Sequence, residues 1–429
     1  MIGACVWDWV DQGLERFGGH PGEFLFGGDF TDVPNDVDFC CNGLTTPDRQ
    51  ETAKLQELKR VYQYIKISGG EDPHTVNVRN AYAFTDLSDF RIAWELLADG
   101  HTVEVGEMES PAAAPGQSIS LNVPFSTVIG TDAEYMLDIA FSLKESNDWA
   151  EAGFELARQQ IVLNGVDPVL PPYEPQDRRV EVRIDPVTGL LEGMHIAWYR
   201  MVGNDKFTDV TPFRSYPVAD SYSERWDGDI RIVEVSGRLV IEAKEPVMMP
   251  YSIQYDIYTD GTVDVEAFFV KTSPIIRRMG FRFDLPAGYN DVFWYGRGPH
   301  ENYVDRMRSA DLNIWDMNVE EMSEEHYVRA QSRGNREDVR WINISNDEGG
   351  SVKVTAEGHM AFSALHYTDE AIASVMHDFE LSKVREYGTM LYIDAAQQGL
   401  GNNTCGPRPL EKYMIRENAP VRLKFRIEK

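Results

Sequence analysis

The sequence predicts a mainly β protein, with a small immunoglobulin-like β-sandwich and a larger β domain behind a short loop-rich segment. Apolar and polar residues alternate with a period of two over much of the chain after residue 71, which is typical of half-buried strands. Turn signals such as Asp99-Gly100 and Pro115-Gly116 separate these stretches. The clearest helical spacing of apolar residues precedes them, within residues 48–70.

The loop-rich segment covers residues 1–50 and leads into the predicted helix. Asp48 and Glu51 have the spacing of a capping box, which marks the start of a helix. Apolar residues then recur on one helical face: Leu55, Leu58, Tyr62 and Ile65. The pair Gly69-Gly70 predicts the end of this helix.

The predicted small sandwich follows at residues 71–163. Alternation predicts strands at residues 75–80, 92–96, 119–123 and 136–141. About seven short strands fit into about 95 residues, which favours an immunoglobulin-like sandwich.

A stretch with four prolines, residues 165–177, predicts a stiff and extended linker. Beyond it, residues 178–429 consist almost entirely of strand and turn patterns, with strands expected at 179–184, 251–258, 262–266 and 421–425. A single β domain of this length is large but physically reasonable.

The composition limits which partners and which cellular compartment we expect for this protein. The net charge of −29 argues against nucleic acid and anionic membranes as partners, because both need clustered basic residues. No apolar run approaches the roughly 18 residues of a membrane-spanning helix. The spacing of Cys5, Cys40, Cys41 and Cys405 fits neither a disulfide framework nor a zinc site, so we expect reduced thiols and a cytoplasmic location.

Four segments could carry chemistry, and each also has a structural interpretation. Residues 6–12 place two tryptophans beside carboxylates, which suits a sugar's apolar face and its hydroxyls but also suits a packed core. Residues 26–44 form an acidic loop that could donate oxygens to a hard cation or be an ordinary turn. Residues 294–306 form a tight loop expected to expose His, Glu, Asn and Arg, or to be a turn with an internal ion pair. Residues 401–407 form a polar turn.

Together these segments resemble, in order and spacing, the C-terminal part of lactase-type β-galactosidases of glycoside hydrolase family 2. The matching motifs are WDWVDQGL (7–14), GGDFTDVPNDVDFCCNGL (27–44), DWAEAGFELARQQ (148–160), WYGRGPHENYVDR (294–306), GNREDVRW (334–341) and FSALHYT (362–368). The resemblance implies a remnant of the (β/α)8 catalytic barrel at 1–68 and the second immunoglobulin-like sandwich at 69–164. The linker at 165–177 then leads to a C-terminal super-sandwich at 178–429 that resembles galactose mutarotases.

The resemblance also implies roles for individual residues. Trp7 matches a wall of the galactose pocket, and Asn42 lies beside the sugar. Phe39, through its backbone oxygen, and Asn42, through its side chain, match a sodium site, while Asn35 matches a secondary magnesium position. Cys405 stands where some members place a tryptophan on the aglycone side. Na⁺ and Mg²⁺ are therefore the cofactors expected in the complete enzyme.

Retaining glycosidases need two carboxylic groups about 5 Å apart. In this family both are glutamates upstream of the position of Trp7, as are the principal magnesium ligands, so we expect this chain alone not to hydrolyse β-galactosides. It would be a C-terminal fragment, or a split subunit whose partner chain carries the rest of the barrel. The expected partners are a β-galactoside and this second chain or further copies of the protein. The alternative is a non-catalytic carbohydrate-binding protein, or a mutarotase-like protein that uses His300 and Glu301.

Overall fold

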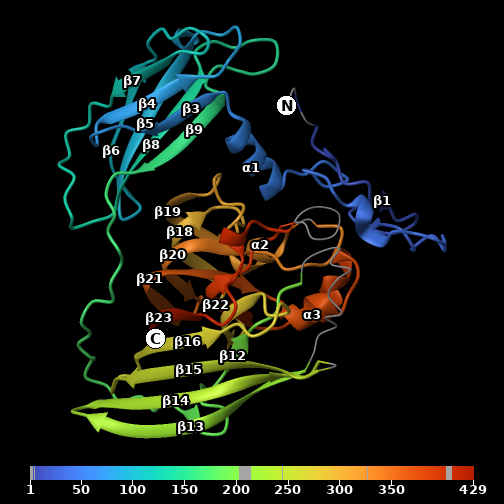
Figure 1. The fold of residues 1–429 in the computed structure, drawn as a ribbon, viewed down its shortest axis with the longest axis vertical. Helices are drawn as coiled ribbons and strands as arrows, with labels where there is room; N and C mark the ends of the chain where they lie inside the picture. Colours follow the sequence, from blue (N-terminus) through green and yellow to red (C-terminus); the bar gives the residue numbers. More distant parts are fainter. Residues whose placement is uncertain (1–2, 4, 202–213, 244, 326, 402–407) are drawn as a thin grey trace. The chain divides into compact units, whose positions relative to one another are not determined.

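The computed structural model describes residues 3, 5–201, 214–243, 245–325, 327–401 and 408–429 (Figure 1). The chain forms two compact units. The first contains Met1–Leu55, Pro168–Met307 and Trp315–Lys429, and the second contains Gln56–Asp167 and Arg308–Ile314. We describe each unit by itself.

The second unit contains a β-sandwich over residues 65–162, all of which are described. Its sheets have three strands in the order β3-β4-β7 and four in the order β6-β5-β8-β9. The strands are β3 (Ile65–Gly69), β4 (Thr75–Asn80), β5 (Phe90–Ala98), β6 (His101–Glu109), β7 (Ser118–Asn122), β8 (Tyr135–Leu143) and β9 (Glu155–Val162), with the short helix η2 (Leu87–Asp89) before β5. Alternate residues of both sheets, among them Val76, Ile92 and Ile139, are fully buried between them. The expected immunoglobulin-like sandwich is confirmed.

The helix before this sandwich is shorter than the sequence pattern predicts. Helix α1 spans Ala53–Tyr62, and the hydroxyl oxygen of Thr52 accepts a hydrogen bond from Lys54 N at 3.2 Å. The predicted capping box is wrong, because Glu51 forms an antiparallel bridge with Thr45. Ile65 begins strand β3, whose pattern buries it as an alternating strand residue. The sandwich's first sheet therefore begins four residues before the expected domain boundary at 68/69.

The large β domain lies in the first unit. Within the described residues, its main sheet has twelve strands, nine of them in the order β12-β17-β22-β21-β23-β16-β15-β14-β13, with β20, β18 and β19 branching from β21. Figure 1 shows the long strands β13–β16 as one layer, apart from the layer that contains β18, β20 and β21. The strands are β12 (Met194–Ala197), β13 (Ser215–Asp227), β14 (Ile230–Ile241), β15 (Val247–Ile257), β16 (Val263–Val270), β17 (Arg278–Leu285), β18 (Asp291–Gly298), β19 (Asp311–Asn318), β20 (Arg336–Ser345), β21 (Ser351–Leu365), β22 (Thr389–Gln397) and β23 (Pro420–Glu428).

A continuous core fills this large sandwich. Fully buried side chains such as Tyr255, Phe269, Phe281 and Trp294 come from several of its strands. Short helices lie in the connections between its strands: α2 (Val319–Ser323), α3 (Asp369–Ala373), η3 (Asp378–Val384) and η4 (Glu411–Tyr413). The mainly β architecture agrees with the fold class that the sequence predicts.

The prediction of a strand at 179–184 is mostly wrong. Only Ile184 enters a strand, the two-residue β10 (Ile184–Asp185), which pairs with β11 (Leu190–Leu191). The side chains of 179–183 alternate in type, but no neighbouring strand pairs with their backbone, and a strand needs such a partner.

The proline-rich linker forms no strand, and from Pro168 onward it is bound to the large domain. The carbonyl oxygen of Pro168 accepts from Gly358 N at 2.7 Å, and that of Pro171 accepts from Arg426 Nη1 at 2.8 Å. The Tyr173 hydroxyl donates to Asp260 Oδ2 at 2.7 Å. Prolines lack an N–H, so their carbonyl oxygens and the neighbouring side chains make these bonds.

Candidate functional site

The two N-terminal motifs lie side by side in the first unit. Residues 8–12 run parallel to residues 40–45, with a bridge between Val10 and Thr45. The Asp8 amide donates to Asn42 O at 3.1 Å, and the Thr45 amide donates to Trp9 O at 3.0 Å. Gly43 permits this close approach, because a Cβ there would overlap the backbone of Val10 and Asp11. The rest of this segment contains the hairpin β1 (Leu14–Glu15) and β2 (Phe24–Leu25) and the short helix η1 (Val37–Cys40).

This pairing brings together three of the residues predicted for the site. Trp7 directly precedes Asp8, which is bonded to Asn42, and the side-chain amide of Asn42 donates to the carbonyl oxygen of Phe39. The Trp7 side chain is 78% exposed, so its indole face is open to a ligand. An exposed indole beside an amide can cover a sugar's apolar face and bind a hydroxyl.

The Phe39 carbonyl and the Asn42 amide fit the expected sodium site in donor chemistry. Both are neutral oxygen donors, which hard cations accept, and the Asn42 side chain reaches the Phe39 oxygen directly. A cation bound there would take the place of the Asn42 N–H and would need the amide turned so that its oxygen faces the ion. These two residues would supply only part of the coordination shell of such an ion.

Asn35 has a different environment. Its side-chain nitrogen donates to Asp32 O at 2.8 Å, and its Oδ1 accepts from Val37 N at 3.1 Å, so both ends of the amide hold the acidic loop in shape. Within the described residues, no three His, Cys, Asp or Glu side chains gather in a way that could hold a metal ion. The magnesium role of Asn35 stays a prediction that rests on the resemblance.

The carboxylates of the first motif are occupied by local bonds. Asp8 accepts from its neighbours Trp9 N at 2.6 Å and Gln12 Nε2 at 2.5 Å, and Asp11 accepts from Gly43 N at 2.5 Å. Burial raises the pKa of Asp11, although the charge of Lys54 opposes this, and burial lowers the pKa of Lys54. Asp11 thereby supports the pairing of the two segments, whereas the bonds of Asp8 stay within its own segment.

The acidic loop is bound to the large domain by contacts that the sequence analysis missed. Asp29 Oδ2 accepts from Phe26 N and lies 2.8 Å from His377 Nε2. The Phe26 ring stacks on the His377 ring with centroids 4.5 Å apart. Arg329 Nε lies 3.9 Å from Asp38 Oδ2. Since Asp29 and His377 are 348 residues apart in sequence, no local pattern could have paired them.

The expected exposure of the 294–306 loop is wrong for Glu301 and Asn302, which are fully buried. The Glu301 carboxylate accepts from Arg306, from the Tyr327 hydroxyl and, at 3.1 Å, from Gly334 N. Burial alone would raise the pKa of Glu301, but the Arg306 charge and these donors hold it below its ordinary value. The second interpretation, a turn with an internal ion pair, is the one that the structure supports.

Two further predictions have simpler outcomes. Cys405 lies outside the described residues. None of the helices in the described ranges combines the length and the apolar character that a membrane crossing requires.

Comparisons with known proteins match most of the chain, in three parts that follow one another along the sequence. Residues 1–67 match the model of the TIM barrel domain of glycosyl hydrolases family 2, residues 76–164 match β-galactosidase domain 4, and residues 165–427 match the β-galactosidase small chain. A solved exo-chitosanase from Amycolatopsis orientalis covers 73% of this chain and 29% of its own at 11% identity, with a TM-score of 0.20 that carries no argument.

Several curated relatives are called β-galactosidases. The protein from Streptococcus thermophilus is 27% identical over 99% of this chain and 44% of its own length. Those from Lactobacillus delbrueckii subsp. bulgaricus and Bifidobacterium adolescentis are 28% and 29% identical, over 94% and 99% of this chain and 42% and 44% of their own. The chain thus spans less than half the length of these relatives. Because the small-chain model alone covers more than half of the sequence, the chain belongs to the β-galactosidase small-chain family.

Proposed function

We propose that the chain acts as the C-terminal part of a β-galactosidase, which hydrolyses terminal β-galactosides such as lactose with retention of configuration. The observation that carries this proposal is the unbroken order of the three family matches, from the barrel segment through the sandwich to the small-chain domain. The relatives that align with nearly the whole chain are β-galactosidases, which supports the same reaction class.

The chain's own contribution is one wall of the sugar pocket. Trp7 presents an exposed indole face for the apolar side of galactose, and Asn42 offers an amide to a neighbouring hydroxyl. Phe39 and Asn42 would hold a sodium ion, which supplies a fixed positive charge beside the sugar's hydroxyls. The pairing of residues 8–12 with 40–45 keeps these groups in place before substrate arrives.

Catalysis in this proposal requires further barrel strands. A (β/α)8 barrel takes about 250 residues, whereas the barrel model matches residues 1–67 of this sequence. The nucleophile and the acid/base glutamate would therefore come from preceding barrel strands, either on a longer polypeptide or on a partner chain. We also propose a cytoplasmic setting, which the free thiols of Cys5, Cys40 and Cys41 support.

The test uses the chain joined to, or mixed with, the polypeptide that carries the preceding strands. Trp7→Ala should lower kcat/KM for a chromogenic β-galactoside by about tenfold or more, since it removes the ring's contact with the sugar. Trp226→Ala, which removes an exposed tryptophan from strand β13, is the matched control and should change nothing. Equal kinetics for Trp7→Ala and the unaltered chain would contradict the proposed site.

Replacing Na⁺ by a large organic cation tests the metal ligands. KM for the galactoside should rise in the unaltered enzyme and should already be raised, and independent of Na⁺, in Asn42→Ala. A response to Na⁺ that is the same in both would contradict the sodium site at Phe39 and Asn42.

A further inference from the structure

A cavity of about 630 Å³ opens in the large domain where the two ends of its main sheet meet. Strand β12 ends the sheet on one side and β13 ends it on the other, and residues of both line the cavity. The turn between β10 and β11 closes one end, held by a bond from Ala219 N to Val187 O at 2.9 Å. The volume is within the range of small-molecule sites, about 300–1,000 Å³.

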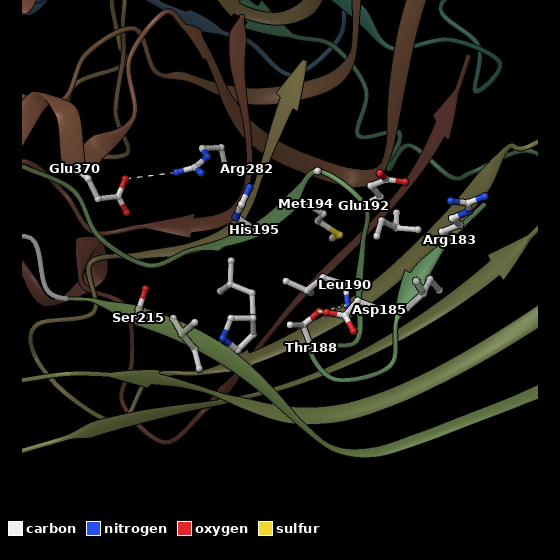
Figure 2. Close-up of a pocket in the computed structure, with 16 residues that line it drawn as sticks. Arg183, Asp185, Thr188, Leu190, Glu192, Met194, His195, Ser215, Arg282 and Glu370 are labelled. Atoms are coloured by element: carbon white, nitrogen blue, oxygen red, sulfur yellow. Dashed lines mark hydrogen bonds and ion pairs between the residues drawn. The ribbon is translucent and has the colours of Figure 1, made fainter. Parts of the chain in front are cut away.

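The cavity has an apolar floor and a polar wall. Leu190, Met194, Ile196 and Leu239 belong to the domain core and form the floor. Figure 2 shows Glu370, Arg282 and His195 on one side of the cavity, with Ser215, Thr188 and Asp185 across from them. His195 and Arg282 are register partners on β12 and β17, so their side chains emerge on the same face.

The polar wall is held in place by a chain of charged contacts. Arg282 Nη1 lies 3.4 Å from Glu370 Oε2, and Arg282 Nε donates to Asp284 Oδ1 at 2.8 Å. Asp284 Oδ2 in turn lies 2.9 Å from His195 Nε2. The other ring nitrogen of His195, Nδ1, has no hydrogen-bond partner among the described residues, and half of the Glu370 side chain is exposed. The wall therefore offers a fixed histidine nitrogen and a fixed carboxylate to a ligand.

We propose that this cavity binds a neutral saccharide of one or two rings. Sugar hydroxyls both donate and accept hydrogen bonds, which matches a wall that contains both donors and acceptors. The apolar floor suits the C–H face of the sugar ring. Two arginines, Arg183 and Arg282, stand against three carboxylates, Asp185, Glu192 and Glu370, so the site has no excess positive charge to hold an anion. Binding at this cavity would not require the galactosidase function.

A peptide strand added to the edge of β13 would fit this cavity less well than a sugar does. Strand addition needs a row of free backbone donors and acceptors along an edge. Pro217 on β13 has no N–H, and the Ala219 amide is already bonded to Val187. The β13 edge therefore offers few donors at the point where it borders the cavity.

The experiment titrates galactose, glucose and lactose separately into the 429-residue chain and follows binding by calorimetry and by the NMR signal of the His195 ring. At least one sugar should bind saturably and should shift the His195 signal. The affinity should be weak, because the residues that line the cavity include no Phe, Tyr or Trp ring. His195→Ala and Glu370→Gln should each weaken this binding by about tenfold, the loss of a hydrogen bond to a charged or fixed polar group. Glu348→Gln, an exposed charge in a turn of the same domain, is the matched control.

Trp7→Ala separates this site from the proposed galactose pocket. Binding that shifts the His195 signal should be the same in Trp7→Ala as in the unaltered chain. The proposal is overturned if no sugar binds, if binding is lost in Trp7→Ala but unaffected in His195→Ala, or if inorganic phosphate displaces the sugar at His195. Each of these results can occur whether or not the complete enzyme hydrolyses galactosides.

Discussion

Replacing Glu301 by glutamine should destabilise the large domain strongly. The Glu301 side chain is fully buried and accepts from Arg306, Tyr327 and Gly334 N, so the amide of glutamine would direct an N–H group at one of these donors. The Arg306 side chain, 12% exposed, would lose its counter-charge. Breaking a buried ion pair on one side costs about 3–5 kcal/mol, because an unpaired charge stays in a poorly solvated place.

The assay is unfolding in a series of urea concentrations, monitored by hydrogen exchange of peptides from β18 to β20. These peptides report on the large domain separately from the small sandwich. The midpoint for these peptides should fall in Glu301→Gln and stay unchanged in Glu348→Gln, which alters an exposed carboxylate. The double variant Glu301→Gln with Arg306→Met should be less destabilised than the two single changes added together, because neither charge is then left unpaired.

A loss below about 1 kcal/mol would refute this reasoning, since it would mean that water solvates Arg306 as well as the carboxylate does. Galactose epimerase activity in the unaltered chain that disappears in a stably folded Glu301→Gln would also refute it. That result would make Glu301 a catalytic residue in place of a structural one.

Three further changes test the contacts inside the first unit: Gly43→Ala and Asp29→Asn in the N-terminal segment, and Glu337→Gln on strand β20. Gly43→Ala should raise hydrogen exchange in residues 38–46, because its Cβ would overlap the paired segment, whereas Gly3→Ala, which has open space, should not; equal exchange would contradict the close approach. Asp29→Asn should loosen residues 26–40 by weakening the contact with His377, and unchanged exchange there would show that this contact holds nothing. Burial, with a smaller effect of a neighbouring carboxylate, raises the pKa of Glu337 from 4.5 to about 8, so stability should fall as pH rises from 4.5 to 8; Glu337→Gln should lack this fall, and parallel pH profiles would contradict it.

The small sandwich was the most predictable part of the fold. The strand predicted at residues 75–80 has the same bounds as β4, because each residue there alternates between the core and solvent. Alternation also predicted a strand at 179–184, but only Ile184 of these residues is in a strand. The prediction fails because an alternating pattern reports side-chain type and not the presence of a neighbouring strand. The predicted helix extends too far at its C-terminal end for a similar reason, since Ile65 fits a helical stripe and a buried strand equally well. At its N-terminal end the bridge between Glu51 and Thr45 replaces the predicted capping box.

The candidate site residues follow from the resemblance, whereas the contacts that hold them could not be predicted. The resemblance implies roles for Trp7 and Asn42, and the structure bonds Asp8, the residue after Trp7, to Asn42. The bond between Asp29 and His377 and the burial of Glu301 depend on contacts between distant segments, which leave no local trace. Glu301 also shows how a motif rich in polar residues can be a packed, fully bonded turn and not a ligand site.

The proposed role of the chain is tested most directly by turnover of a chromogenic β-galactoside by the purified 429-residue chain, expressed in a host that lacks β-galactosidase. We expect no turnover by the chain alone and restored turnover when the polypeptide with the preceding barrel strands is added. Turnover by the chain alone, lost in Trp7→Ala, would contradict the claim that its two catalytic carboxylates must come from outside these residues.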